Sequence, residues 1–181
     1  MLPALVILVL AWALAAITKD MKTADWLAGV VQSNIQTEGG LQTLAIWLPA
    51  MIFLVSGAVA FATGSSWGTM AILYPAMLPL IWEIGGAANM PEAMILPLFF
   101  NGVACVLAGA VFGDHCSPIS DTTVLASIFA GADHIDHVTT QIPYAITCAV
   151  VAGIMYLLYG FVGLSPFILI PFGIVALVAL A

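Results

Sequence analysis

The sequence predicts an all-α polytopic membrane protein, and its composition and hydropathy pattern both support that fold class. Of the 181 residues, 64% are hydrophobic and only 6% are charged, whereas a soluble globular domain has about 25% charged residues. Because so few charges cannot cover a water-facing surface, most of the surface must face lipid. The alternating strands of about ten residues that are typical of a membrane β-barrel do not occur in the sequence.

The charge balance excludes one class of partner. Nine acidic residues against two lysines give a net charge of −7, whereas nucleic-acid binding requires a basic patch. The cysteines Cys105, Cys116 and Cys148 are scattered without CxxC spacing. They are therefore interpreted as reduced, buried small residues rather than as a disulfide framework or a zinc site.

The first 42 residues are predicted to hold a short span and a polar connection. Residues 2–17 are apolar, with no basic segment before them and no cleavage site after them. They are therefore a span rather than a signal peptide, although about 20 residues are needed to cross a bilayer. The connection at 18–42 holds both lysines, which places it in the cytoplasm. Within it we expect an interfacial helix at 24–31 and a segment end at 38–40.

Longer apolar segments predict the remaining spans. They lie at 41–62, 93–112, 142–159 and 165–181. The last is expected to begin with Ser165 as N-cap and Pro166 at the first helical position. Residues 83–92, which include two glycines and a proline, are expected to form a solvent-exposed connection.

Two further apolar pieces, at 68–82 and 118–131, are too short to cross a membrane alone. Each follows a longer segment after a break rich in Gly, Ser and Thr. Hydrophobic segments interrupted by Gly or Pro indicate discontinuous helices around a transport site near the bilayer midplane. The sequence therefore predicts broken or re-entrant helices at two places.

The break at 113–123 carries most of the polar chemistry. Gly113 is expected to end one helix, because glycine readily adopts the left-handed conformation. Ser117 and Pro118 are then expected to start the next helix. This arrangement leaves residues 114–116 in an unwound gap between two half-helices.

Asp114 is the principal candidate for a cation site in this gap. Its carboxylate and the free carbonyls of residues 112 and 113 would offer hard oxygen ligands, which suit Na⁺. Burial disfavours the charged form of a carboxyl group and a bound cation favours it. Proton and Na⁺ would then compete for one site, which is the minimal chemistry of an antiporter. The alternative is a solvent loop that merely joins two helices.

Other polar side chains near Asp114 have two interpretations each. His115 could relay protons or orient Asp114. Asp121 could bind the cation or stabilise the start of the following helix. The hydroxyl groups could complete the cation shell or act as helix caps, and they belong to Ser117, Ser120, Thr122 and Thr123.

The break at 63–69 has the same pattern without a charge. Gly64 could end one helix, and a following serine could cap the next. The hydroxyl groups expected to line the same cavity belong to Thr63, Ser65, Ser66 and Thr69. Small residues also allow close packing of helices in membranes, which is the alternative interpretation.

A third polar cluster lies at 133–137, with the sequence Asp-His-Ile-Asp-His. One helical face could present His134 and His137 to zinc, which would make the protein a membrane-embedded metalloenzyme. Because a third ligand at suitable spacing is absent, an exposed acidic loop is the favoured interpretation. We therefore expect no catalytic residues, no bound metal and no cofactor.

Long ordered motifs resemble the NhaC-type Na⁺/H⁺ antiporter family, which belongs to the ion-transporter superfamily. These motifs cover residues 11–14, 61–70, 112–123, 133–138 and 141–145. The resemblance implies a multi-pass secondary transporter of the cell membrane, built from two inverted repeats with re-entrant or broken helices. Its transported ions would be Na⁺ and H⁺.

Transporters of this kind are usually more than twice as long as this chain. The resemblance therefore implies that residues 1–181 form a single transmembrane domain, the carboxyl-terminal repeat. Its partners would be membrane lipid and an amino-terminal repeat supplied by another segment or another chain. A homodimer is a further alternative. The family includes exchangers coupled to malate and lactate, but no basic residue lies near either break, which favours a cation. A non-transporting membrane subunit is the remaining alternative.

Overall fold

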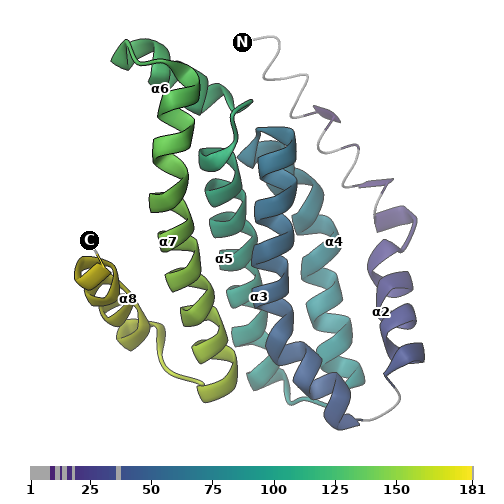
Figure 1. Ribbon diagram of the computed structural model, residues 1–181. Helices are drawn as coiled ribbons and strands as arrows, with labels where there is room; N and C mark the ends of the chain where they lie inside the picture. Colours follow the sequence, from purple (N-terminus) through teal and green to yellow (C-terminus); the bar gives the residue numbers. More distant parts are fainter. Residues whose placement is uncertain (1–8, 11–12, 14–15, 18, 36–37, 181) are drawn as a thin grey trace.

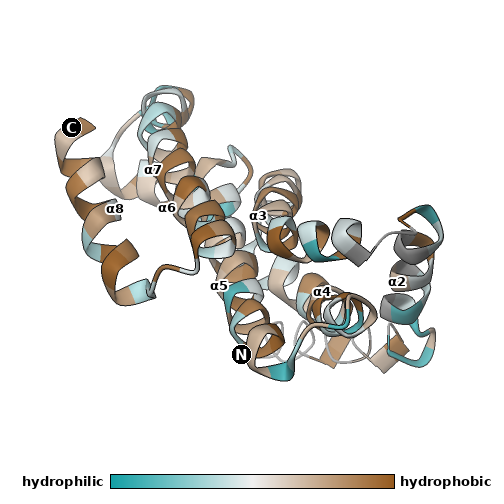
Figure 2. Cartoon of the chain, turned by 90° about the horizontal axis from the view of Figure 1, so that it is seen from below, coloured by the Kyte–Doolittle hydropathy of each residue, from teal (hydrophilic) through white to brown (hydrophobic). Residues whose placement is uncertain are grey.

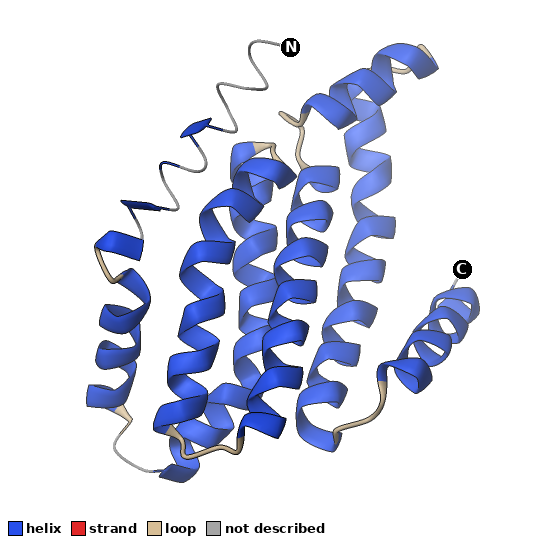
Figure 3. Ribbon diagram, turned by 180° about the vertical axis from the view of Figure 1, so that it is seen from behind, coloured by secondary structure: helices blue, strands red, loops and turns tan. Residues whose placement is uncertain are grey.

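The computed structural model describes residues 9–10, 13, 16–17, 19–35 and 38–180. Every regular element of this part of the chain is a helix, and the longer helices run side by side (Figure 1). Figure 3 shows the same helices from behind, joined by short loops. The helices are α2 (Thr23–Asn34), α3 (Glu38–Thr63), α4 (Ser66–Ala87), α5 (Glu92–Cys116), α6 (Asp121–Ala130), α7 (His134–Val162) and α8 (Pro166–Leu180).

Helix α5 lies at the centre of the bundle and packs against α3, α4, α6 and α7. Its interface with α3 is the most extensive, while α2 packs on α4 and α8 packs on α7. Four of the described helices, α3, α4, α5 and α7, are long and apolar enough to cross a membrane. Hydrophobic residues make up much of each long helix in the view from below (Figure 2). The prediction of an all-α polytopic membrane protein is confirmed.

Small residues bring α3 and α5 close together. Gly57 and Gly113 face each other so closely that a Cβ atom at Gly113 would collide with the Gly57 carbonyl oxygen. Nearby, the hydroxyl group of Ser56 donates a hydrogen bond of 2.7 Å to the carbonyl oxygen of Val106. Close approach and interhelical hydrogen bonds of this kind hold membrane helices together without a hydrophobic driving force.

This close packing explains why the prediction that Gly113 ends a helix is wrong. Helix α5 continues through Gly113 to Cys116, so residues 114–116 form its last turn rather than an unwound gap. Glycine serves there as a contact surface, not as a left-handed residue. By contrast, Gly64 and Gly131 have φ angles of 65° and 62° and follow the ends of α3 and α6. The predicted helix end at Gly64 is therefore confirmed.

The predicted half-length helix at 68–82 is also wrong. Helix α4 has 22 residues and contains Pro75 and Pro79 in its interior. Membrane helices tolerate internal proline because neighbouring groups satisfy the freed backbone carbonyls. The connection predicted at 83–92 therefore shrinks to residues 88–91. The other short helix is confirmed, since α6 has only 10 residues.

The two ends of the chain differ from expectation in detail. The predicted span at 2–17 lies almost wholly outside the described residues. The helix expected at 24–31 is part of α2, which runs alongside α4 (Figure 1). Residues 38–40 begin α3 and do not end a segment. Helix α8 begins at Pro166 as expected, but its 15 residues are fewer than the 20 or so that cross a bilayer.

Candidate functional site

The candidate site lies where α5 ends and α6 begins. Asp114 is in the last turn of α5, Ser120 directly precedes α6, and Thr122 is in the first turn of α6. The hydroxyl group of Ser120 donates a hydrogen bond of 2.7 Å to Oδ1 of Asp114. The Ser120 and Thr122 hydroxyl oxygens are 2.7 Å apart, and Thr122 Oγ1 is 3.5 Å from Oδ2 of Asp114. Three of the predicted site residues therefore form one oxygen cluster.

The cluster is closed on one side and open on the other. Asp114 is 7% exposed and Ser120 is fully buried, whereas Thr122 is exposed. A buried carboxylate needs hydrogen bonds or a counter-charge to remain ionised. Carboxylate and hydroxyl oxygens are hard ligands, which suit cations such as Na⁺ rather than soft transition metals. Chemically, the cluster can exchange its hydrogen bonds for a small cation that arrives from the Thr122 side.

Two other predicted site residues lie away from this cluster. Asp121 is exposed, and its carboxylate accepts a hydrogen bond of 2.8 Å from the backbone amide of Thr122, which stabilises the start of α6. His115 is exposed as well, and its side chain lines a cavity of about 680 Å³ between α5 and α7. The structure therefore supports the helix-start interpretation of Asp121 and shows His115 facing a different cavity.

Ser117 connects the site to α3. Its buried hydroxyl group donates a hydrogen bond of 2.8 Å to the carbonyl oxygen of Phe61, near the end of α3. In the same loop, the Ile119 carbonyl oxygen would lie 2.9 Å from a Cβ atom added at Gly64. The two breaks that the sequence indicated are therefore in direct contact, at one end of the bundle.

The hydroxyl groups of the first break bond within their own hairpin. Ser65 caps α4 as expected, since its side chain accepts a hydrogen bond of 3.1 Å from the amide of Gly68. Thr63 donates to the carbonyl oxygen of Val59 at 2.9 Å and lies 3.4 Å from the hydroxyl group of buried Thr69. Ser66 is the first residue of α4. These residues shape the α3–α4 turn beside the site, while the oxygen cluster itself comes from α5 and α6.

The polar cluster at 133–137 starts a helix and is not a loop. Asp133 caps α7 by accepting from the amides of Ile135 and Asp136 at 2.9 and 3.2 Å. His134 is half-buried, with its Nε2 2.7 Å from the carbonyl oxygen of Pro118. Among the residues that the structure describes, no three His, Cys, Asp or Glu side chains are grouped to hold a metal ion. No sequence pattern indicates the contact between His134 and the α5–α6 loop.

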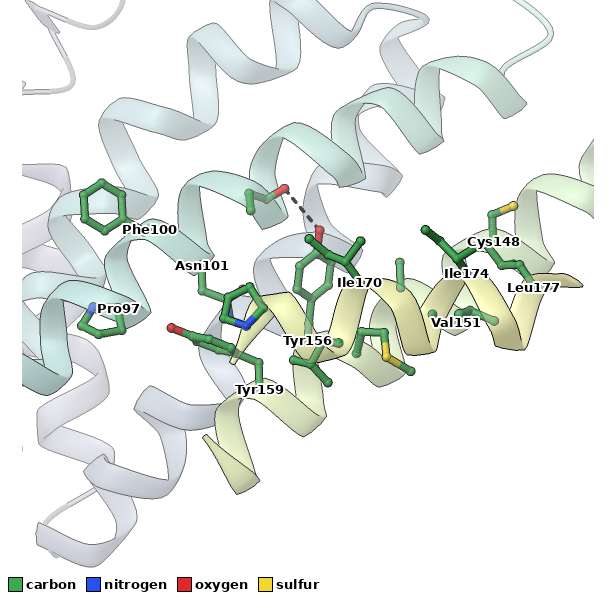
Figure 4. Close-up of a pocket in the computed structure, with 16 residues that line it drawn as sticks. Pro97, Phe100, Asn101, Cys148, Val151, Tyr156, Tyr159, Ile170, Ile174 and Leu177 are labelled. Carbon is green, nitrogen blue, oxygen red and sulfur yellow. Dashed lines mark hydrogen bonds between the residues drawn. The ribbon is translucent and has the colours of Figure 1, made fainter. Parts of the chain in front are cut away.

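Two amides that line the cavities beside α7 were not predicted from the sequence. Asn101 lines a cavity of about 490 Å³ between α5, α7 and α8, together with Tyr156 and Tyr159 (Figure 4). Its Nδ2 atom is buried without a hydrogen-bond partner, as is Oε1 of Gln141 in the neighbouring cavity. A hydropathy profile averages such single amides into an apolar segment, and hence it does not reveal them.

The cysteines are free, as expected, but they are not all buried. Cys105 and Cys116 are buried in α5, whereas Cys148 on α7 is exposed. Cys148 lines both cavities beside α7. The prediction of a buried residue is therefore wrong for Cys148, because α7 exposes this face to the cavities rather than packing it.

Comparisons with known proteins agree on one family. Residues 1–161 match the family model described as the Na⁺/H⁺ antiporter family. The chain is 42% identical over 158 residues to an uncharacterized protein of Haemophilus influenzae, which covers 87% of this chain and 27% of that protein. No solved structure matches the chain.

Two named relatives are antiporters. The Malate-2H(+)/Na(+)-lactate antiporter of Bacillus subtilis is 35% identical over 138 residues, covering 75% of this chain and 27% of that protein. The Na(+)/H(+) antiporter NhaC of Alkalihalophilus pseudofirmus is 31% identical over 143 residues, covering 74% of this chain and 29% of that protein. The chain therefore spans less than a third of the length of these relatives.

Proposed function

Because this chain belongs to the Na⁺/H⁺ antiporter family, we propose that it forms part of a secondary transporter that exchanges Na⁺ for H⁺ across the cell membrane. The observation that carries the proposal is the buried carboxylate of Asp114 with the hydroxyl groups of Ser120 and Thr122 beside it. Ionisable side chains within membrane-spanning helices are functional candidates by default, and Asp114 lies in the last turn of the candidate spanning helix α5.

The exchange follows from the two states of the Asp114 carboxyl group. When it is ionised, its buried negative charge attracts a cation, and the Ser120 and Thr122 oxygens complete part of the shell. When a proton binds, the charge disappears and the cation loses its strongest ligand. Proton and Na⁺ therefore exclude each other, and the site carries one or the other in each half of the cycle.

The rest of the transporter is proposed to cover the open side of this site. Thr122 is exposed, and α6 carries Leu125, Ile128 and Phe129 at 50%, 65% and 84% exposure. An amino-terminal repeat packed here would bury these apolar side chains and add ligands to the cluster. Lipid would cover the outer faces of α7 and α8, unless the complete transporter forms a homodimer through them.

Exchange coupled to an organic acid is the second candidate. The Bacillus subtilis relative is named as a malate/lactate antiporter, which shows that the family's cargo varies. Residues 61–70 and 112–123 contain no Lys or Arg that could pair with a carboxylate substrate. For that reason Na⁺ and H⁺ alone are the preferred cargo.

The experiment compares Asp114→Asn with Asp121→Asn in the complete transporter, which is this chain with the remainder present in its longer relatives. Both substitutions remove one carboxylate from the same end of the bundle, but only Asp114 is buried in the oxygen cluster. In everted vesicles, Na⁺-driven proton movement is followed with a pH-sensitive dye. Asp114→Asn is expected to abolish exchange, whereas Asp121→Asn should retain most of it.

Three results would change the assignment. Unchanged Na⁺-driven proton movement in Asp114→Asn would exclude this carboxylate as the exchange site. Inhibition of Na⁺-dependent exchange by added malate or lactate would favour the organic-acid candidate. A complete wild-type transporter without any flux would favour a non-transporting membrane subunit.

A further inference from the structure

The side chain of His134 connects three elements at the end of the bundle that carries Asp114. Its Nε2 is 2.7 Å from the carbonyl oxygen of Pro118, and its Nδ1 is 3.1 Å from the hydroxyl oxygen of Ser127. Pro118 belongs to the loop of residues 117–120, called here the 117–120 loop, while Ser127 belongs to α6. Ser127 is buried, and its hydroxyl group also lies 2.9 Å from the carbonyl oxygen of Thr123.

Counting protons in this network distinguishes two states of the ring. A carbonyl oxygen only accepts, so Nε2 must carry a hydrogen toward Pro118 in both states. In the neutral ring Nδ1 accepts, and Ser127 must turn its single hydrogen away from Thr123. In the protonated ring Nδ1 donates to Ser127, which then donates to Thr123. Protonation of His134 therefore adds one buried hydrogen bond to the network.

The 117–120 loop transmits this contact to the candidate site. Pro118 lies between Ser117, which donates to α3, and Ser120, which donates to Asp114. We propose that His134 is a positioning residue that holds the 117–120 loop, and with it the Ser120 hydroxyl group, against Asp114, and that protonation of its ring tightens this hold. The proposal rests on the function proposed above for Asp114.

The carboxylates at the end of α5 and at the starts of α6 and α7 are engaged elsewhere. Asp133 caps α7, Asp121 accepts from the amide of Thr122, and Asp114 accepts from Ser120. Asp136 lies in the first turn of α7 together with His134 and is exposed, and His137 follows it. On α5, His115 lines the cavity toward α7. The ring of His134 thus forms its hydrogen bonds with Pro118 and Ser127.

The first test measures the loop itself and does not require transport. The Ile119→Cys substitution introduces a thiol in the 117–120 loop at a position that is 64% exposed, and Cys148 is replaced by Ser because it is exposed. In the complete transporter, the maleimide reaction rate at this position is measured from pH 5.5 to 8. The rate of a free thiol in solution, measured over the same range, corrects for the change in the fraction of thiolate with pH. One hydrogen bond corresponds to a change of about two- to tenfold. The corrected rate should be slower by that factor at low pH.

The second variant separates the two parts of the proposal. His134→Gln keeps a neutral N–H that can reach Pro118, and it should therefore retain a slow reaction rate but lose the pH dependence. His134→Ala loses both contacts and should react fastest at every pH. His137→Ala, on the same helix, is the control and should match the parent protein.

Exchange activity is the second readout. His134→Ala should raise the Na⁺ concentration for half-maximal exchange about two- to tenfold with a smaller change in maximal rate, while His134→Gln should recover part of that loss. Equal labelling rates and pH profiles in His134→Ala and His137→Ala would overturn the proposal. If His134→Ala changes the labelling rate but the parent transporter shows no Na⁺/H⁺ exchange, the loop contact is supported and the proposed function is rejected.

Discussion

Ser120 shows how a single side chain distinguishes a site from a helix start. It occupies the N-cap position of α6, yet its side chain makes no capping hydrogen bond. Such a cap ordinarily stabilises a helix by about 1 kcal/mol. The hydroxyl group donates to Asp114 instead, although Ser65 at the corresponding position of α4 does cap its helix. The Ser120 hydroxyl group therefore bonds to the Asp114 carboxylate rather than capping α6.

A substitution at Ser120 should weaken Na⁺ binding. A hydroxyl group that contacts a charged group contributes about 1.5–3 kcal/mol. Ser120→Ala should therefore raise the half-maximal Na⁺ concentration about tenfold or more, because the cation loses one of the oxygen ligands proposed for it. The Na⁺ dependence of exchange by the complete transporter measures this change.

Thr140→Ala provides the matched control for Ser120→Ala. The hydroxyl group of Thr140 is exposed and bonds to the Asp136 carbonyl oxygen of its own helix at 2.7 Å. Its removal should leave the Na⁺ dependence unchanged. Equal half-maximal Na⁺ concentrations in Ser120→Ala and the parent protein would remove Ser120 from the proposed cation shell.

The sequence indicates residue types near the site better than it indicates their contacts. Asp114, Ser120 and Thr122 were all candidates, and the structure brings them together. His115 and Asp121 were further candidates, each next to a cluster residue in the chain. The continuation of α5 as a helix turns His115 away from Asp114, because adjacent residues on a helix point about 100° apart. At the start of α6, Asp121 accepts from the amide of Thr122 instead. That cation binding occurs at the cluster stays a prediction.

At the level of the helices, close packing explains the boundaries that hydropathy mispredicts. A glycine within a polar motif is typical of a helix end. At Gly113, however, the backbone of α3 fills the space that a side chain would occupy. The same interface contains Gly109, where a Cβ atom would lie 2.8 Å from Ser56 Cβ. Such tertiary contacts are invisible in a single sequence. The long spans are predictable, because their apolar length must match the bilayer.

Enlarging Gly113 should therefore weaken the bundle. Gly113→Ala places a methyl group against the Gly57 carbonyl oxygen, and overpacking of this kind costs about 1–3 kcal/mol. The control is Gly153→Ala on α7, where an added Cβ atom meets nothing within 4 Å. Gly153→Ala should be neutral or slightly stabilising, because alanine favours a helix by up to about 1 kcal/mol.

Thermal unfolding of the complete transporter in detergent compares the two glycine variants. Gly113→Ala should lower the midpoint temperature, whereas Gly153→Ala should leave it unchanged or raise it. If both variants unfold at the same temperature as the parent protein, the contact between α3 and α5 at Gly113 is not as close as the structure shows.

For the molecule as a whole, helix length predicts that the two breaks lie at one membrane surface. Asp114 follows Glu92 by 22 residues on one continuous helix, which is about 33 Å at 1.5 Å per residue. The hydrocarbon core is about 30 Å thick. An α5 that crosses the bilayer from Glu92 therefore brings Asp114 to the opposite interface. This placement differs from the midplane site that the Gly- and Pro-containing breaks predicted from sequence.

Chemical labelling from the two sides of the membrane tests this placement. Trp67 and Ile119 lie within the two breaks and are 79% and 64% exposed, while exposed Glu92 begins α5 at the other end. Trp67→Cys, Ile119→Cys and Glu92→Cys are each made in the complete transporter with Cys148 replaced by Ser. A membrane-impermeant maleimide is then applied to right-side-out and to everted vesicles.

The first two variants should react from one side and Glu92→Cys from the other, because α3, α4 and α5 each traverse the full bundle between their loops (Figure 1). The bond of 3.4 Å from Gln42 Nε2 to the Ala88 carbonyl oxygen supports this, since it joins the start of α3 to the loop before Glu92. Protection of Ile119→Cys from both sides, with Trp67→Cys still reactive, would instead place the 117–120 loop within the membrane. Asp114 would then have to exchange its ions through a path that the remainder of the transporter provides.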